Sequence, residues 1–286
     1  MLMMQGFYTG PLDVNCYVVY DDQTKNGFMV DPGGVSKTLT SFIETQHIKI
    51  KMIFLTHGHG DHIGGAREYR ETYQAPIYAH KEEGIVLGSA MYNSSAMMFG
   101  YPVELQADVY VTDGQEIPFE GHTIKILHTP GHSPGGICIL IEKWLFCGDT
   151  LFAGSVGRTD FPLCSTKDLF DGIRNKLFTL DPDTMAFPGH GPSTTIGFEK
   201  EHNPFFLAGE KACIRSGFGK TYPGSKSRPW PFCFCPGRLL RSQQMKLWER
   251  AKAFPLFLRA GKSPCPRSVF FTGDALPPIQ RNGKTP

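Results

Sequence analysis

Short apolar runs alternate with turn residues along the first 205 residues of the chain. Residues 16–20 (CYVVY) and 27–30 (GFMV) predict the two strands of a hairpin, because both are rich in β-branched and aromatic residues and a polar stretch joins them. An Asp, a Pro and two Gly residues follow directly and end the second strand. The beginning of the chain is therefore expected to form part of a β-sheet.

Further strands and helices are expected after this hairpin. Short apolar runs bounded by Gly, Pro or Asp predict strands at 52–55, 76–79, 123–127, 136–141, 144–147 and 184–187. Helical spacing of apolar residues predicts helices at 36–45, 63–73 and 166–180. Strands that alternate with helices are typical of sheets covered by helices, which carry their functional sites in loops at strand ends. The expected fold class is α/β.

The rest of the chain has a different composition. Residues 206–286 contain ten prolines and only one stretch with helical spacing, at 239–254. Residues 1–205 carry 14 Lys and Arg against 24 Asp and Glu, whereas residues 206–286 carry 15 against 3. Such a change predicts a folded domain over 1–205 and an irregular, basic, Pro-rich extension over 206–286.

Three interpretations of this extension remain open. We favour a flexible segment, because its composition offers little apolar surface to offset the entropy lost on ordering. Basic residues interleaved with Trp230, Phe232, Phe234 and Trp248 would suit phosphates and stacked bases. Charge alone does not lead us to expect a nucleic-acid partner. The abrupt change in composition is also what a read-through or a shifted reading frame produces.

Composition excludes several classes of protein. The 286 residues are 41% hydrophobic, which is enough to bury a core. No run of about eighteen apolar residues occurs, and the start lacks the basic and apolar regions of a signal peptide, so we expect neither a membrane span nor secretion. Eight cysteines without a CxxC pair indicate neither a disulfide scaffold nor structural zinc. A reducing, cytoplasmic setting is expected.

The strongest chemical signal is THGHGDH at residues 56–62, directly after a predicted strand. Its ligand-type residues are His57, His59, Asp61 and His62. Imidazole nitrogen and carboxylate oxygen bind zinc and similar metals, and four such groups this close together exceed what one tetrahedral ion uses comfortably. The two glycines allow the tight backbone that this crowding requires. The motif predicts a site for two adjacent ions.

Three further ligand-type residues occupy similar places, each in a Gly-containing loop after or at the end of a predicted strand. His132 lies in TPGHSPGG, Asp149 in CGDT and His190 in PGHG. Each is weak evidence by itself, because a single His beside Gly is more often a turn residue than a ligand. Together with residues 56–62, they supply the additional ligands that two ions need.

Taken in order, His-x-His-x-Asp-His, Pro-Gly-His, Gly-Asp-Thr-Leu-Phe and a last Gly-His resemble the metallo-β-lactamase superfamily, and within it the glyoxalase II-like hydroxyacylglutathione hydrolases. The resemblance covers about residues 6–205 and implies an αββα fold, in which two sheets pack between helices. The ligand sets that it implies are His57, His59 and His132 for the first ion, Asp61, His62 and His190 for the second, and Asp149 as the bridge.

The chemistry implied by this resemblance is hydrolysis of a thioester by two zinc ions, and the ligand types also permit iron or manganese. A water molecule between two ions has its pKa lowered from 15.7 to about 7, which would make a bridging hydroxide the nucleophile. Asp61 is the catalytic residue expected to orient it. A thiolate leaves readily because a free thiol has a pKa of about 8.5, so no strong general acid is needed.

The candidates for substrate contact are Arg158, Phe152, Phe161 and Tyr17. The guanidinium of Arg158 would suit a carboxylate of an acidic thioester, for example one whose thiol carrier is glutathione. An ion pair with Asp160 or Asp168 that fixes the loop is an equal alternative for Arg158. The three aromatic residues are candidates for an apolar wall, although core packing is the more common role of such residues. The expected partner is a small-molecule thioester, and no oligomeric state is predicted.

Other activities within the resemblance stay open to different degrees. His59 disfavours the flavodiiron branch, which has Glu there, and Asp149 disfavours antibiotic-hydrolysing lactamases, which typically lack the bridging Asp. The segment GRTDF at 157–161 is shared with persulfide dioxygenases, so a mononuclear iron dioxygenase is an alternative that would use first-site histidines with Asp149. A lactonase is another. The longer glyoxalase II enzymes have a C-terminal helical domain that helps to hold glutathione, and the chain lacks the pattern of that domain. The non-enzyme alternative is an inactive hydrolase domain that binds nucleic acid through its basic tail.

Overall fold

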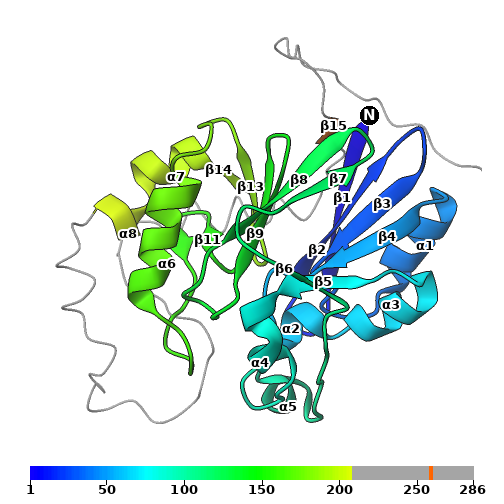
Figure 1. Cartoon of the computed structure of the whole chain (residues 1–286), viewed down its shortest axis with the longest axis horizontal. Helices are drawn as coiled ribbons and strands as arrows, with labels where there is room; N and C mark the ends of the chain where they lie inside the picture. Colours follow the sequence, from blue (N-terminus) through cyan, green and yellow to red (C-terminus); the bar gives the residue numbers. More distant parts are fainter. Residues whose placement is uncertain (208–257, 260–286) are drawn as a thin grey trace, which may run out of the picture.

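The computed structural model describes residues 1–207 and 258–259. Two mixed β-sheets face each other, and helices cover their outer faces (Figure 1). The first sheet has the strand order β15-β1-β2-β3-β4-β5-β6, and the second has the order β14-β13-β10-β9-β8-β7. The expected αββα sandwich of class α/β is confirmed.

The strands of the first sheet are β1 (Leu2–Thr9), β2 (Val14–Asp21), β3 (Asn26–Val30), β4 (Lys49–Phe54), β5 (Ile77–His80), β6 (Val109–Val111) and β15 (Leu258–Arg259). Those of the second are β7 (Glu116–Phe119), β8 (His122–His128), β9 (Ile137–Ile141), β10 (Trp144–Gly148), β13 (Met185–Pro188) and β14 (Thr194–Thr195). A two-stranded ribbon contains β11 (Leu151–Phe152) and β12 (Ser155–Val156). The helices are α1 (Lys37–Thr45), α2 (Gly60–Ile63), α3 (Ala66–Tyr73), α4 (Gly84–Leu87), α5 (Ser95–Phe99), α6 (Thr166–Gly172), α7 (Ile196–His202) and α8 (Pro204–Leu207), with a 3-10 turn η1 (Lys81–Glu83) and a π turn η2 (Ile173–Leu177).

Buried apolar side chains fill the space between the layers. Along β2, successive side chains point to opposite faces of the sheet. Cys16 and Val18 pack toward α1 and α3, whereas Tyr17 and Val19 pack toward the second sheet. Because both faces of β2 are covered, the strand is apolar throughout, which is why it reads as a continuous run in the sequence. A third cluster packs the second sheet against α6 and η2.

The predicted strands are all present. The predicted hairpin is β2 and β3, in which Tyr17 pairs with Val30 and Tyr20 with Gly27. The other six predicted strands are β4, β5, β8, β9, β10 and β13. The apolar pattern does not predict β1, whose Met, Gln and Gly residues have weak β propensity, nor the short strands β6, β7 and β14.

Two of the predicted helices need correction in their bounds. The helix predicted over 63–73 begins later, as α3 at Ala66, because residue 63 is the last residue of α2 and Gly64 and Gly65 separate the two helices. The break allows backbones to approach, because a Cβ on Gly65 would lie 2.8 Å from the carbonyl carbon of Gly34. The helix predicted over 166–180 is α6 followed by the π turn η2. The helix predicted over 36–45 is α1, which Ser36 caps by accepting the N–H of Leu39.

Little of the basic extension belongs to the described part of the chain. Of residues 206–286, only 206–207 and 258–259 are described, so the helix predicted at 239–254 and the aromatic residues considered for base stacking lie outside it. Strand β15 pairs antiparallel with β1, with Leu258 opposite Met4. Among the described residues, no helix has the length and apolar character that crossing a membrane requires.

Candidate metal centre

The predicted ligands come from loops that follow β4, β8, β10 and β13. The loop after β4 holds His57 and His59 and runs directly into α2, which holds Asp61 and His62. Each of these four residues is at most 5% exposed. Gly60 allows this loop to pack closely, because a Cβ there would lie 2.8 Å from the Cα of Ser95. The glycine predicted to permit a tight backbone is therefore needed where α5 approaches α2.

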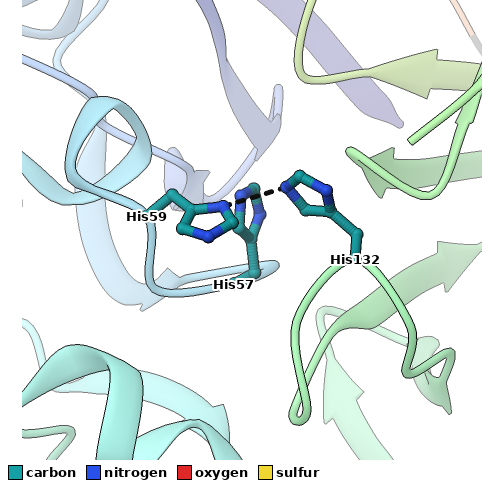
Figure 2. A group of neighbouring side chains, drawn as sticks. All are labelled: His57, His59 and His132. Carbon is teal, nitrogen blue, oxygen red and sulfur yellow. Dashed lines mark hydrogen bonds between the residues drawn. The ribbon is translucent and has the colours of Figure 1, made fainter. Parts of the chain in front are cut away.

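The first site consists of three imidazole rings that converge from the two halves of the sandwich. His57 and His59 lie on the loop after β4, and His132 lies on the loop after β8, facing them across the gap (Figure 2). Ring centroids of His57 lie 4.8 Å from those of both His59 and His132, and the latter two are 4.6 Å apart. The structure brings these three predicted ligands together.

Hydrogen bonds determine which nitrogen of each ring faces this site. Nδ1 of His132 donates to the Arg158 carbonyl at 2.8 Å, so Nε2 carries the lone pair. Nδ1 of His57 lies 3.2 Å from the Thr56 hydroxyl, which leaves its Nε2 for the site. Nδ1 of His59 is 2.9 Å from Nε2 of His132. Two ligands of one zinc ion bound at about 2.0–2.1 Å lie roughly 3–3.5 Å apart, so these nitrogens are near the spacing that a shared ion requires.

The second site contains Asp61, His62 and His190, whose ligand atoms also lie close together. Nε2 of His190 is 3.2 Å from Oδ2 of Asp61, and Nε2 of His62 is 4.0 Å from the same oxygen. Asp149 lies between the two sites. One of its oxygens is 3.4 Å from Nε2 of His62, and the other is 3.6 Å from Nε2 of His132. The carboxylate is therefore in contact with a ligand of each predicted ion.

The two sites fit metal ions by a test independent of the motif. Four buried side-chain atoms have no hydrogen-bond partner among the described residues, and three of them lie here: Nε2 of His57, Nε2 of His62 and Oδ1 of Asp149, the last two 3.4 Å apart. A buried polar atom without a partner costs about 1–3 kcal/mol, so such atoms need an explanation. Coordination to a cation would supply the missing partner, and imidazole with carboxylate is a donor set that suits zinc, iron or manganese.

The imidazoles of the first site are held neutral. Burial lowers the pKa of His57 well below its usual value, and the neighbouring imidazoles lower it further. The same two causes lower the pKa of His59 to about 3. Burial also lowers the pKa of His132, although Asp149 and the Arg158 carbonyl partly oppose this. Neutral imidazole is the form that binds a metal, so the first site is ready for an ion at neutral pH.

The second site has the opposite electrostatics. Burial by itself would lower the pKa of His62, but the carboxylates of Asp149, Asp31 and Asp61 outweigh it and raise that pKa well above its usual value. Asp149 and Asp61 likewise outweigh burial at His190 and raise its pKa. In the metal-free protein, these two imidazoles are therefore protonated and paired with carboxylates, and an ion must displace their protons.

Asp31 supports the second site, and sequence reasoning assigned it only to a turn. Its carboxylate accepts the Thr56 N–H at 2.7 Å, the Thr56 hydroxyl at 2.5 Å and Nδ1–H of His62 at 2.9 Å. The last bond directs Nε2 of His62 to the site and makes the ring a better ligand. Asp31 is 1% exposed. The sequence signal that could have identified Asp31 is its place at the end of a buried strand, because an ionisable residue there needs polar partners.

Arg158 forms the ion pair considered as its alternative role. Its Nε and Nη2 donate to the two carboxylate oxygens of Asp160 at 2.6 and 2.8 Å. The guanidinium lies over the ring of Phe161, 4.0 Å from the centroid, and that ring is 5.4 Å from the ring of His59. The loop of Arg158 thus lies against the first site and also provides the carbonyl that orients His132.

The other two candidates for substrate contact differ in exposure. Tyr17 is 7% exposed and packs in the core against Phe146 and Phe187. Its hydroxyl donates to the carbonyl of Pro188 at 2.7 Å, so it supports the loop that carries His190. Phe152 is partly buried at the end of β11. We therefore propose no substrate contact for Tyr17.

Another group of ligand-type residues, His80, Glu82 and His128, lies outside this centre. The rings of His80 and His128 are stacked, with centroids 3.8 Å apart and an angle of 15° between the planes. Lone pairs of imidazole lie in the ring plane, so two stacked rings do not direct them at a common point. In addition, Nε2 of His128 donates to the Pro134 carbonyl at 2.9 Å. We do not propose an ion there.

Comparisons with known proteins agree with the geometry. The model of the metallo-beta-lactamase superfamily matches residues 9–190. Hydroxyacylglutathione hydrolase GloC of Haemophilus influenzae is 38% identical over 199 residues, which are 67% of this chain and 92% of that protein. The crystal structure of BLEG-1 B3 metallo-beta-lactamase has a TM-score of 0.68 and 37% identity, covering 72% of this chain and 100% of that one. TTHA1623, solved in a di-iron-bound form, has a TM-score of 0.61 and 33% identity, covering 70% and 98%.

Proposed function

The chain belongs to the metallo-beta-lactamase superfamily, and from this premise we propose that it is a hydrolase that cleaves small-molecule thioesters at a centre of two metal ions. The observation that carries the proposal is the pair of ligand clusters that share Asp149. The proposed ligands are His57, His59 and His132 for the first ion, Asp61, His62 and His190 for the second, and Asp149 for both. The likeness to a hydroxyacylglutathione hydrolase supports a glutathione-linked thioester as substrate.

Zinc is our proposed metal, with iron as its main competitor. Four of the six terminal ligands are buried imidazoles, which suit zinc and iron alike. The di-iron form of TTHA1623, at 33% identity, is the specific reason to measure iron as well. Either ion would act as a Lewis acid on the carbonyl oxygen of the substrate and lower the pKa of a bound water to about 7.

Asp61 is the residue that we propose to orient the attacking water. Burial would raise its pKa, but His62 and His190 outweigh this effect and hold the pKa below its usual value. The carboxylate is therefore ionised at neutral pH and acts as a hydrogen-bond acceptor. An acceptor fixed beside His190, at 3.2 Å from its Nε2, holds the lone pair of the water toward the substrate carbonyl carbon.

The reaction needs no protein nucleophile. Burial raises the pKa of Cys147 well above its usual value and that of Cys164 to about 11, so both thiols stay protonated at neutral pH. The departing thiolate has a pKa of about 8.5 and leaves with little help from a general acid. A thioester therefore demands less of this site than an amide does.

We also propose that the protein works in the cytoplasm. The four cysteines in the described residues, Cys16, Cys138, Cys147 and Cys164, are free thiols. Free thiols are compatible with a reducing compartment, in which glutathione-linked substrates are also found.

The experiment that tests the proposal combines metal analysis with turnover. We expect about two zinc ions per chain in the purified full-length protein, together with hydrolysis of S-lactoylglutathione. Asp149→Ala should reduce both, because each ion loses a ligand. Asp183→Asn is the matched control, since Asp183 has an 84% exposed side chain and lies on the surface. Wild-type turnover in Asp149→Ala would reject the proposal. One iron per chain, with oxygen consumed in the presence of glutathione persulfide, would favour the dioxygenase instead.

Hydrolysis of a β-lactam is the second candidate, because a structure that is 37% identical is described as a B3 metallo-beta-lactamase. The lactam nitrogen is a poorer leaving group than a thiolate and requires a proton donor. A chromogenic cephalosporin and a simple lactone should accordingly be turned over more slowly than the thioester. A higher kcat/KM for either compound would reassign the substrate class while leaving the metal centre in place.

A further inference from the structure

We propose that Glu83 is a positioning residue of the first metal site: its buried carboxylate ties the loop of His57 and His59 to the loop of His132. This inference rests on the metal centre of the proposed function. Glu83 ends the turn η1 after β5 and is 0% exposed. It belongs to neither ligand motif.

The carboxylate of Glu83 uses both of its oxygens. Oε1 accepts the backbone N–H of Gly58 at 2.7 Å. Oε2 accepts the Ser133 hydroxyl at 3.0 Å and the backbone N–H of Gly135 at 2.7 Å. In its ionised form, a carboxylate accepts some of the stronger hydrogen bonds in proteins. One side chain therefore satisfies three donors on two separate loops.

Two of these donors are adjacent to proposed ligands, and the third, Gly135, is on the same loop as His132. Gly58 lies between His57 and His59, and Ser133 follows His132. The first loop leaves β4 of the first sheet, whereas the second joins β8 to β9 of the second sheet. Glu83 thus connects the two sheets at the point where their imidazoles must meet around one ion.

Packing leaves this carboxylate little freedom. A Cβ on Gly58 would lie 3.1 Å from Oε1 of Glu83, and a Cβ on Gly135 would lie 2.3 Å from the backbone nitrogen of Glu83. Gly135 therefore leaves no room for a side chain, and a side chain at Gly58 would press against the carboxylate. Burial raises the pKa of Glu83 to about 7, and the three donors oppose this rise. An apolar side chain would fill such a position at lower cost, but it would leave two backbone N–H groups unpaired.

Glu83→Gln tests the role because it keeps the shape and changes one acceptor into a donor. The amide group must face the N–H of either Gly58 or Gly135, so one loop loses its bond and is repelled. We expect the affinity for the first ion to fall about 10- to 100-fold, which is typical when a residue that orients metal ligands is replaced. Ser133→Ala removes one bond and retains the carboxylate, so it should weaken the first ion by a smaller factor. Glu82→Gln, at a neighbouring exposed position, is the matched control and should have no effect.

The measurement is a zinc titration of the metal-stripped full-length chain against a chromogenic chelator, with thermal unfolding recorded before and after loading. A selective loss of first-ion affinity, with a smaller zinc-induced rise in Tm, supports the inference. Equal falls in Tm with and without zinc, at unchanged affinity, would show a purely structural role and overturn it. If Glu83→Gln does not fold, wild-type affinity in Ser133→Ala overturns it. If the wild-type chain binds only one ion, the two-ion centre of the proposed function is wrong. The role of Glu83 is then tested by the effect of Glu83→Gln on the affinity for that one ion. A chain that binds none overturns both.

Discussion

The opposite electrostatics of the two sites predict that metal ions bind in a fixed order and release different numbers of protons. The imidazoles of the first site have lowered pKa values, that of His59 to about 3, so they are neutral before any ion arrives. His62 and His190 have raised pKa values and are protonated in the metal-free protein. The first ion should therefore release almost no protons, and the second should release about two.

The size of the pH dependence of metal affinity follows from the number of protons that each ion displaces. Each proton displaced makes the affinity rise tenfold per pH unit, as long as the pH is below the pKa of the group. An unperturbed His has a pKa of about 6.5 and is mostly protonated at about pH 5.5. The raised pKa values of His62 and His190 keep both imidazoles more protonated than this reference between about pH 5.5 and about pH 6.5. Affinity for the second ion should accordingly increase by up to about 100-fold over this range, which is the limit for two displaced protons, whereas affinity for the first should change little. A bound water with a pKa of about 7 adds few protons at these pH values.

Calorimetric titration of the metal-stripped chain with zinc, in two buffers that differ in ionisation enthalpy, counts the protons released at each step. Asp31→Asn provides an internal comparison, because loss of a carboxylate beside His62 should lower the number released in the second step. Two steps with the same pH dependence, or a first step that releases two protons, would refute the reasoning.

Three substitutions test the surrounding contacts. Asp31→Asn should weaken the second ion about 10- to 100-fold in a chelator titration, because His62 loses its charged partner, and an unchanged affinity would show that this contact is dispensable. Tyr17→Phe should lower the unfolding free energy by about 1 kcal/mol in urea titrations and leave KM unchanged, because the hydroxyl's bond to the Pro188 carbonyl and its contact with Asn15 are lost; a raised KM would indicate that Tyr17 contacts the substrate. Arg158→Met and Asp160→Asn should each change turnover of S-lactoylglutathione by no more than about fivefold, because both break the same ion pair, and Arg158→Met also removes the contact with Phe161. A higher KM in Arg158→Met alone would indicate that Arg158 binds the substrate.

The ligand set was accessible to sequence reasoning because metal chemistry restricts residue types within short motifs. Residues 56–62 contain four ligand-type side chains in one short segment, and the structure gathers His132, Asp149 and His190 around them. The strands were accessible for a related reason. Those covered on both faces, such as β2, are continuous apolar runs that end at turn residues.

The residues that support the ligands could not be predicted from the sequence, because their partners are distant along the chain. Asp31 reaches His62 across 31 positions, and Glu83 reaches Gly135 across 52. No local pattern encodes such pairs. Likewise, the run CYVVY is apolar at every position, so it does not indicate which side chains face the second sheet, and Tyr17 lies in the core. The break between α2 and α3 depends on contact with Gly34, which the helical spacing alone does not contain.

The measurement that tests the central claim most directly is anomalous diffraction at the zinc absorption edge from crystals of the zinc-loaded protein. We predict two peaks about 3.5–4 Å apart, both within coordination distance of Asp149, one beside His57, His59 and His132 and the other beside Asp61, His62 and His190. A single peak, or a pair that Asp149 does not touch, would contradict the account.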